Sequence, residues 1–290
     1  MIMKKIFLFS CLFFVQFSMM AQNEGRVGFF SGVSKTVLAN TDDAKFGDFL
    51  PTFKPGFGLD AAYHFTLGKH FPMGFSVEFF NQKMGQNYHG FYADSTSYYA
   101  YSRLNYLKAG LAMHFGTNPR RAFALTLSFG ANMGFLTNYQ DRYELIRYNN
   151  DRYILDIKNT DVTLDDTAKI KGTLTSPMYN KTDLCVFGKL GFDVLLSSQW
   201  VLSVYGRLDY GLSPVENTSK MNINFNTQPA SSMPYKPFNT KVKYHGPTND
   251  LVTHSTTTNQ AMGVYLALHY RIFNKEKSEF YYKENSRYNN

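Results

Sequence analysis

Cysteine is almost absent from this chain of 290 residues, which contains only Cys11 and Cys185. Cys11 falls in an apolar stretch near the N-terminus that reads as an export signal, so one cysteine remains in the mature chain. An internal disulfide is therefore excluded, and the fold must be stable without one. A lone cysteine on a strand is typically a small packing residue rather than a reactive group.

Long hydrophobic runs and dense charge are also missing. Beyond the N-terminus no run reaches the ~18 apolar residues of a transmembrane helix. Charged residues make up 18% of the chain, and the net charge of +8 falls to +6 without Lys4 and Lys5. The basic residues are scattered along the sequence, so we expect no nucleic-acid partner. Gly-rich phosphate-binding motifs are absent, and we predict no cofactor.

The N-terminus has the pattern of a secretory signal peptide. Lys4 and Lys5 precede an apolar core at residues 6–17, and a short exit ends at the small residue Ala21. This order of a basic start, an apolar core and a small residue predicts cleavage after Ala21, giving a signal peptide at residues 1–21. The alternative is an anchor helix, for which the apolar core is too short.

What the chain does contain is alternation, and it is clearest in residues 123–135, FALTLSFGANMGF. Every odd position is apolar and every even position is small or polar. Side chains of a strand point alternately to two faces, so this period predicts a strand with one apolar face. Its length suits a tilted crossing of a bilayer, which needs about 9–11 residues.

Seven further stretches show similar alternation. Together, the eight predicted strands lie at residues 26–33, 56–67, 73–81, 107–115 (the end of a strand), 123–135, 184–196, 200–212 and 260–273. Their connections alternate between long and short, the long ones being residues 34–54, 82–100, 138–183 and 213–257. Within the largest loop, residues 143–156 predict a hairpin that turns at Asn149 and Asn150.

This pattern predicts an all-β fold: an eight-stranded antiparallel outer-membrane β-barrel over residues 22–273. Short turns of such barrels lie in the periplasm and long loops outside, so both chain ends and the polar tail at residues 274–290 should be periplasmic. The rival architecture is a soluble barrel of lipocalin type, with its apolar face turned inward. The small residues and charges of both signs on the polar faces favour the narrow lumen of a membrane barrel.

Charge inside a barrel is tolerated when it is paired and hydrogen-bonded. The polar faces of the predicted strands therefore predict a lumen polar network. Its members are Asp60, His64, Glu78, Lys108, His114, Lys189, Asp193, Arg207, Asp209, His269 and Arg271.

Three segments resemble the outer-membrane β-barrel proteins of Bacteroidota known as the PorT-like family. They are the signal exit MMAQ at residues 19–22, the strand YLKAGLAMHF at residues 106–115, and the final YRIF at residues 270–273. The resemblance implies an outer-membrane location, recognition by the barrel-insertion machinery and an association with type IX protein secretion and gliding. The 17 residues that follow Phe273 depart from the family's commonest pattern, and the family offers no catalytic motif to match.

Histidines on the strands are the candidates for a catalytic base or a metal site. His64, His114 and His269 share the polar face and lie near the short-turn ends of their strands. A zinc site from all three is conceivable, but hydrogen bonding to the lumen charges is favoured. Four of the acidic residues in the largest loop are candidate calcium ligands, but they lack the spacing of a calcium loop and favour a solvated surface. They are Asp156, Asp161, Asp165 and Asp166.

The sequence therefore predicts a non-enzymatic barrel with a structural, interaction or secretion-associated role in the cell envelope. The expected partners are outer-membrane lipid, the insertion machinery and a periplasmic or secretion-system protein that binds the basic, aromatic tail at residues 274–290. A lipid-modifying enzyme is the alternative, and it requires a Ser/His/acid cluster near the long loops. A wide channel is disfavoured because side chains fill an eight-stranded barrel.

Overall fold

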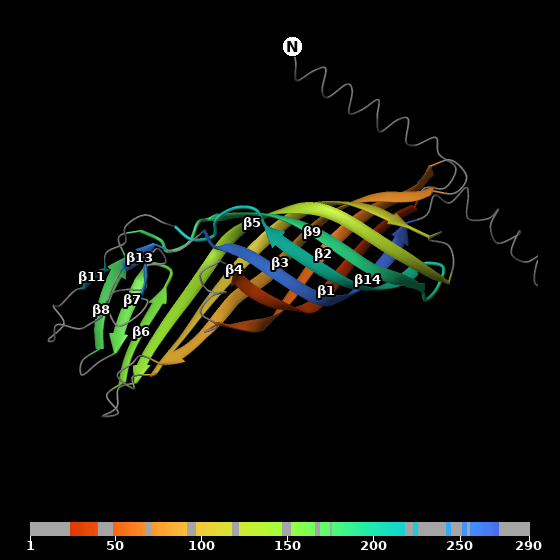
Figure 1. The fold of residues 1–290 in the computed structure, drawn as a ribbon. Helices are drawn as coiled ribbons and strands as arrows, with labels where there is room; N and C mark the ends of the chain where they lie inside the picture. The colour runs from red at the N-terminus through yellow and green to blue at the C-terminus, as the bar shows by residue number, and fades with distance from the viewer. Residues whose placement is uncertain are drawn as a thin grey trace, which may run out of the picture.

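A computed structural model describes most of the chain between Glu24 and Ile272 (Figure 1). The described ranges are residues 24–39, 49–67, 71–91, 97–117, 122–146, 152–165, 169–174, 176–217, 223–225, 242–244, 251–253 and 256–272. The predicted signal peptide at residues 1–21 and the predicted tail at residues 274–290 lie outside them. Within these ranges the chain forms no helix long and apolar enough to cross a membrane.

Eight long strands in the described part of the chain close into an antiparallel barrel. They are β1 (Glu24–Ala39), β2 (Phe49–Leu67), β3 (Phe71–Phe91), β4 (Ser97–Gly116), β5 (Phe123–Ile146), β9 (Thr182–Leu195), β10 (Trp200–Gly211) and β14 (Thr258–Ile272). Each pairs with the next in this order, β5 pairs directly with β9, and β14 pairs with β1 to close the ring. The predicted all-β, eight-stranded antiparallel barrel is confirmed.

The strands are staggered as well as closed. Following paired residues around the ring from Val27 on β1 leads back to β1 at Val37, ten residues further along. The path passes through Ala61, Val77, Leu111, Ala131, Val186, Tyr210 and Gln260. Such a stagger requires the strands to tilt relative to the barrel axis. Which residues face each other across the lumen therefore cannot be read from their positions in the sequence.

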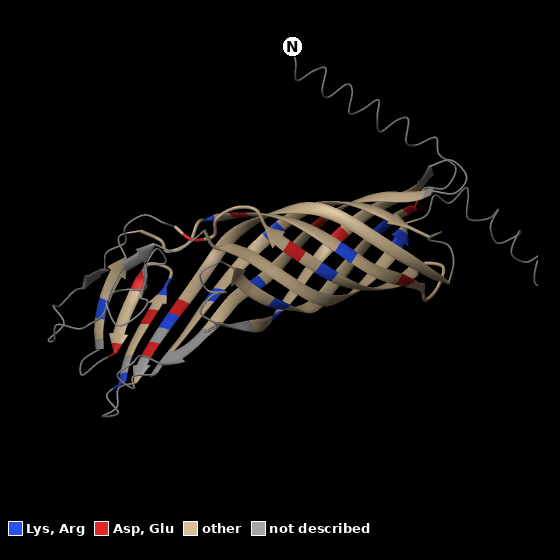
Figure 2. Ribbon diagram, viewed as in Figure 1, with Lys and Arg blue, Asp and Glu red and all other residues tan. Residues whose placement is uncertain are grey.

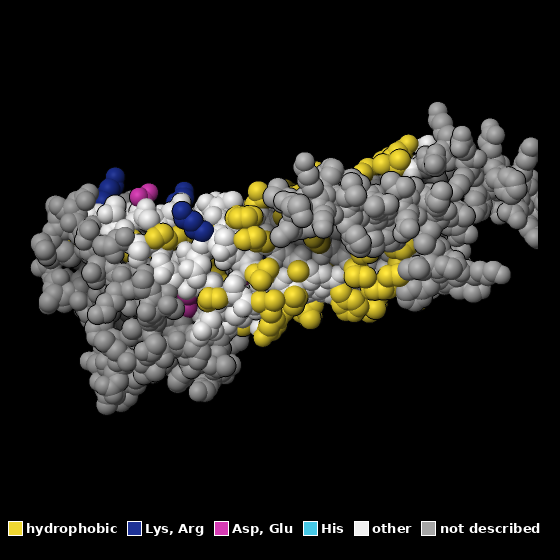
Figure 3. All heavy atoms as spheres, turned by 90° about the horizontal axis from the view of Figure 1, so that it is seen from above, with side chains coloured by type: hydrophobic (Ala, Val, Ile, Leu, Met, Phe, Trp, Pro, Cys, Tyr) yellow, Lys and Arg dark blue, Asp and Glu magenta, His cyan; other side chains and the backbone are white. Residues whose placement is uncertain are grey.

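The outward face of the barrel is apolar. Leu111 on β4 and Leu190 on β9 are 66% and 67% exposed, and large apolar side chains occupy outward positions on all eight strands. On the face seen in Figure 3, hydrophobic side chains gather over the barrel wall, whereas the charged ones lie toward one end. A water-soluble barrel would turn this face inward, so the lipocalin-type alternative is wrong and the outward surface suits a bilayer.

Aromatic side chains mark the edge of this apolar surface at the short-turn end, where β9 leads into β10. Trp200 and Tyr270 lie on the outward face of paired positions, with ring centroids 5.2 Å apart. Rings with an apolar body and a polar tip favour the boundary between lipid and water.

Several strands continue well beyond the predicted ones. β3 runs to Phe91 and β4 begins at Ser97, so the loop predicted at residues 82–100 is wrong over most of its length. β1 and β2 likewise extend into the predicted loop at residues 34–54. These extensions carry polar residues on both faces, and without one apolar face the period-2 signal disappears.

The largest predicted loop is mostly sheet. β5 continues to Ile146 and pairs with β6 (Arg152–Lys158), which is followed by β7 (Asp161–Asp165), β8 (Lys169–Leu174) and β11 (Ile223–Phe225). The predicted hairpin is confirmed in its β5–β6 pairing, while Asn149 and Asn150 lie outside the described residues. In Figure 1 these strands extend past the long-loop end of the barrel, and we call β6, β7, β8 and β11 the outer sheet. A separate hairpin joins β12 (Val242–Tyr244) to β13 (Leu251–Thr253).

A second hydrophobic core lies where the outer sheet meets the extended barrel strands. Leu155 and Ile157 of β6, Leu164 of β7 and Leu104 of β4 are each 1% exposed or less. We call this cluster the outer core. Burial of several large apolar side chains stabilises this region independently of lipid, at about 1.5–3 kcal/mol for each side chain.

Candidate functional site

Charged residues of both signs lie on neighbouring strands of the barrel (Figure 2), and several of their side chains are buried in the lumen. Its centre is Glu78 on β3, whose Oε2 accepts a hydrogen bond from Lys189 Nζ at 2.5 Å and whose Oε1 lies 2.7 Å from Arg207 Nη1. Strands β3 and β10 are four positions apart in a ring of eight, so the contact with Arg207 crosses the full width of the barrel. Glu78 and Arg207 are both buried.

Arg207 is in contact with acidic and aromatic side chains from several strands. Its guanidinium also donates to Asp209 at 2.8 and 2.9 Å, and its plane lies over the rings of Phe80 and Phe187 at 4.5 and 4.1 Å. A desolvated cation gains from both a carboxylate partner and aromatic faces. These contacts block the middle of the lumen.

Two glycines make room for the aromatic part of this blockage. Tyr205 and Tyr265 stack with ring centroids 5.7 Å apart inside the barrel. A Cβ at Gly32 would lie 2.5 Å from the Tyr265 ring, and one at Gly191 would lie 2.5 Å from the Cβ of Tyr205. Only glycine lets the wall approach these rings so closely.

A second ionic cluster closes the short-turn end. Arg271 grips Glu24 through two hydrogen bonds of 2.8 and 2.5 Å, and Arg26 bridges Glu24 at 2.6 Å and Asp193 at 2.5 Å. Glu24 and Arg26 were not among the predicted network residues. Glu24 lies outside the predicted first strand, which begins at Arg26. A strand begun two residues earlier would have placed Glu24 and Arg26 on one face with Phe30.

The three predicted histidines all lie near this end. His269 contacts the Asp60 carboxylate at 3.1 Å, and His114 is hydrogen-bonded to Ser76 and Ser128 at 2.7 Å each. His64 lies beside His114, with ring centroids 5.4 Å apart. Both ring nitrogens of His114 and His269 are engaged, and no group of three metal-binding side chains occurs among the described residues, so the geometry does not support the conceived zinc site.

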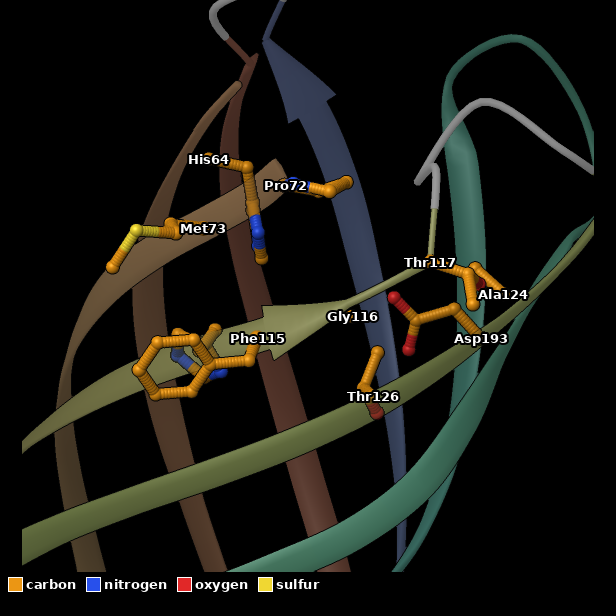
Figure 4. A pocket seen from close by; sticks show the side chains of 10 residues that line it. His64, Pro72, Met73, Phe115, Gly116, Thr117, Ala124, Thr126 and Asp193 are labelled. Carbon is orange, nitrogen blue, oxygen red and sulfur yellow. The ribbon is translucent and has the colours of Figure 1, made fainter. Parts of the chain in front are cut away.

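A small cavity of about 20 Å³ opens among these groups (Figure 4). His64 and Asp193 point into it from different strands of the wall. Its volume suits roughly one water molecule. A drug-sized or metabolite-sized ligand needs a pocket more than ten times larger.

Ser203, His269 and Asp60 form a chain with the composition of a catalytic triad. His269 Nδ1 lies 3.2 Å from Ser203 Oγ, and its Nε2 faces Asp60. However, the Ser203 hydroxyl donates to Asp193 at 2.7 Å, so its proton is directed away from the imidazole. Ser203 is also buried, and the backbone around it is committed to the sheet. A serine whose proton is directed to a carboxylate is not activated by the imidazole, so the arrangement fits a structural network.

Toward the long-loop end the network continues through Lys108. Its ammonium lies 3.2 Å from Asp183 and 3.3 Å from Cys185 Sγ. Asn259 donates to the same carboxylate at 2.9 Å. Asp183 stands at the end of a loop predicted from the sequence, at residues 138–183, so its place in the lumen network was not predicted. Cys185 is fully buried here, as expected for a packing residue.

Beyond the apolar band, the outer core contains two buried acids. Asp141 on β5 accepts hydrogen bonds from the Tyr179 hydroxyl at 2.9 and 3.0 Å, and burial raises the pKa of this carboxyl to about 7. Glu216 accepts one from Thr257 at 2.7 Å, and burial raises its pKa to about 8. Both acids are therefore substantially protonated near neutral pH.

The fold and its apolar outer wall define a small outer-membrane β-barrel. No protein-family profile matches the chain, and no curated protein matches its sequence. Three solved barrels resemble it at low identity. Neisserial surface protein A (NspA) is 9% identical with a TM-score of 0.31, covering 85% of this chain and 96% of that one. Ail of Yersinia pestis is 8% identical with a TM-score of 0.30, covering 86% and 99%. OprG of Pseudomonas aeruginosa is 13% identical with a TM-score of 0.34, covering 87% and 96%.

Proposed function

We propose that this protein is a non-enzymatic outer-membrane barrel that anchors the outer sheet at the cell surface, where the sheet takes part in interactions of the envelope. The observation that carries this proposal is the continuity of β5, which pairs with barrel strand β9 up to Phe135 and then, from Gln140 to Ile146, with β6 of the outer sheet. The membrane part and the outer part thus share one rigid element.

The sealed lumen supports an anchor rather than a channel. The Glu78–Arg207 contact crosses the barrel, and the cluster around Glu24 closes the short-turn end. A lipid-modifying enzyme needs its nucleophile and base near the outer leaflet. The histidines described in the lumen lie at the opposite end, which favours the non-enzymatic role.

A role linked to protein secretion is the finer form of this proposal. It rests on the resemblance of residues 106–115 and 270–273 to PorT-like proteins, and it assigns the tail at residues 274–290 to a periplasmic or secretion-system partner. Under this proposal the chain is exported by its signal peptide, inserted by the barrel-insertion machinery and surrounded by outer-membrane lipid.

The test is complementation of a strain that lacks the gene. The secreted and surface proteomes are compared after return of the full chain, of a chain in which a short turn replaces residues 142–181, or of a chain without residues 274–290. Rescue by the full chain but not by the chain lacking the outer sheet supports the interaction role of that sheet. Rescue by the bare barrel contradicts it.

The secretion role has its own outcome in the same experiment. Proteins with type IX sorting domains retained in the periplasm of the deletion strain support it, and loss of rescue on removal of the tail assigns the partner to residues 274–290. Unchanged export in the deletion strain ends the secretion proposal.

A further inference from the structure

Above the Glu78–Arg207 contact, toward the long-loop end, the lumen contains buried polar atoms that have no hydrogen-bond partner among the described residues. Gln82 on β3 is fully buried, and both the oxygen and the nitrogen of its amide are unpaired in this sense. Asn132, Asp183 and Asn259 are also buried, and each has an unpaired Oδ1 atom. Folded proteins leave few buried polar atoms unpaired, so a group of them indicates a further partner.

The unpaired atoms surround Lys108 on β4. Its Nζ lies 3.2 Å from Asp183 Oδ2, and Asn259 donates to the same oxygen at 2.9 Å. Gln82 and Asn132 lie on the two strands next to Lys108, and each is two residues from the position paired with it. All five side chains are buried. We call Gln82, Lys108, Asn132, Asp183 and Asn259 the upper lumen group.

Two glycines lie in the wall beside this group. Gly56 is paired with Gln82, and a Cβ placed on Gly56 would lie 3.2 Å from its nearest neighbour, the Tyr265 hydroxyl. Gly134 is paired with Lys108 on one side and with Asp183 on the other. Glycine within a strand often marks a place where another group approaches the backbone closely. The wall thus contributes no side-chain volume at these two points.

The upper lumen group is enclosed from both ends of the barrel. Toward the short-turn end, Arg207 fills the lumen through its contacts with Glu78 and Phe80. Toward the long-loop end, Met84 and Leu104 are each 1% exposed and belong to the same buried cluster as the outer core. A partner bound by this group is therefore held inside the barrel and does not pass freely through it.

The charges around the group are balanced among the described lumen residues. The three cations are Lys108, Lys189 and Arg207, and the three carboxylates that pair with them are Glu78, Asp183 and Asp209. An added ion would leave a charge without a partner away from bulk solvent, which is costly. The balance therefore favours a neutral partner.

The unpaired atoms also need a partner that both donates and accepts hydrogen bonds. The amide nitrogen of Gln82 is a donor, whereas the Oδ1 atoms of the upper lumen group are acceptors. Water has both capacities, and one buried water typically makes about three hydrogen bonds to polar atoms that are otherwise unpaired. These atoms therefore suit a small cluster of water molecules.

We propose that the upper lumen group binds a cluster of ordered water molecules between the Glu78–Arg207 contact and the outer core. This water completes the hydrogen bonding of the buried amides and of Asp183, and it solvates the ammonium of Lys108, which has three donors. The barrel thus contains water in its upper lumen without conducting ions. The inference depends on the closed barrel and not on the interaction role of the outer sheet.

The direct test detects water at the Gln82 side chain. The full chain, labelled with ¹⁵N, is folded in detergent micelles, and nuclear Overhauser transfer from water to side-chain protons is measured. The amide protons of Gln82 should receive this transfer. The Nε proton of Arg207 is the control and should receive none, because it is bonded directly to Asp209 at 2.8 Å and its guanidinium lies over two aromatic rings.

A stability measurement gives an independent readout. Gln82→Met replaces the amide with an apolar end of similar length. If water binds the amide, the change breaks those hydrogen bonds and should raise the equilibrium constant of unfolding about tenfold. If the amide is dry, the change removes unpaired polar atoms and should lower that constant.

Gln86→Met is the matched control for this variant. Gln86 is also fully buried, but its Oε1 accepts a direct hydrogen bond from the backbone nitrogen of Leu38 at 2.7 Å. Its replacement should therefore raise the unfolding constant whether or not the upper lumen group binds water.

Water transfer to Gln82 but not to Arg207, with a raised unfolding constant in Gln82→Met, supports the proposal. Absence of transfer at Gln82 overturns it, and so does transfer of equal strength at Arg207, which would indicate general penetration by solvent. A lower or unchanged unfolding constant in Gln82→Met overturns it as well. If Gln82→Met does not fold, the transfer to the Gln82 amide in the wild type decides the question.

Discussion

Arg207 and Glu78 lie 2.7 Å apart at their charged atoms although their strands stand on opposite sides of the barrel. Each side chain spans half of the lumen, and both are buried. A pair in this position acts as a crossbar: it blocks the lumen and joins two walls that share no backbone hydrogen bonds.

Replacing Glu78 by Gln should destabilise the barrel. The change leaves Lys189 without its carboxylate and Arg207 with Asp209 alone. Removing one partner of a buried pair typically costs about 3–5 kcal/mol. The measurement is reversible urea unfolding in lipid vesicles. Glu144→Gln is the control, since its pair with Arg152 is at the surface and should cost about 1 kcal/mol or less. Equal effects of the two variants would contradict a special role for the crossbar.

Removing the contact between Glu78 and Arg207 should let small ions pass through the lumen. The wild type is expected to show no single-channel conductance in a planar bilayer, because the aromatic and ionic groups fill the lumen. A double variant, Glu78→Ala with Arg207→Ala, removes both halves of the contact and should admit small ions. Phe79→Ala, which truncates an outward side chain next to Glu78, should stay closed. Conductance of the wild type itself would refute the sealed lumen.

Charge on the middle of the apolar wall should be costly. Leu111 lies on the outward face of β4 about halfway between the edges of the band, and Leu111→Arg should destabilise the folded barrel by about 2–4 kcal/mol. Trp200 is the single tryptophan, so its fluorescence reports insertion into vesicles directly. Lys83→Arg, at an exposed position on β3 that is already charged, is the control and should be nearly neutral. A neutral or stabilising Leu111→Arg would indicate a surface that faces water.

The outer core should weaken as the pH rises. The pKa of Asp141 is about 7 and that of Glu216 about 8, because burial disfavours their charged forms. An unfolded chain loses these protons near pH 4. The contribution of the two buried acids to the free energy of unfolding is therefore complete below pH ~4. This contribution is lost as the pH rises through about 7 for Asp141 and about 8 for Glu216.

Hydrogen exchange of the β6 and β7 amides checks this expectation. Protection should fall between pH 5 and pH 9 after correction for intrinsic exchange. Asp141→Asn should flatten the dependence, because the amide keeps hydrogen-bond donors without titrating. Asp165→Asn, at an exposed position on β7, should leave it unchanged. A slope that persists in Asp141→Asn and in Glu216→Gln would rule out these two acids as its source.

The sequence predicts the barrel wall well and its surroundings poorly, for a physical reason. Strands such as β5 alternate because one side meets lipid and the other meets the lumen, so the period is visible without any partner. Beyond the band both sides of β3 and β4 meet water or protein, the alternation fades, and residues 82–100 look like a loop. Local pattern cannot recover contacts that depend on the stagger of the whole ring.

The same reason limits the prediction of the sites. Glu78 and Arg207 are recognisable as lumen charges from their strands, but their meeting depends on the closure of eight strands.

The unbroken course of β5 from Phe123 to Ile146 has a mechanical consequence. A force applied to the outer sheet enters the barrel along this strand and pulls it lengthwise against its neighbours β4 and β9. In that direction the hydrogen bonds of both ladders bear the load together instead of breaking one after another. The outer sheet is thus attached in a geometry that resists its detachment from the barrel.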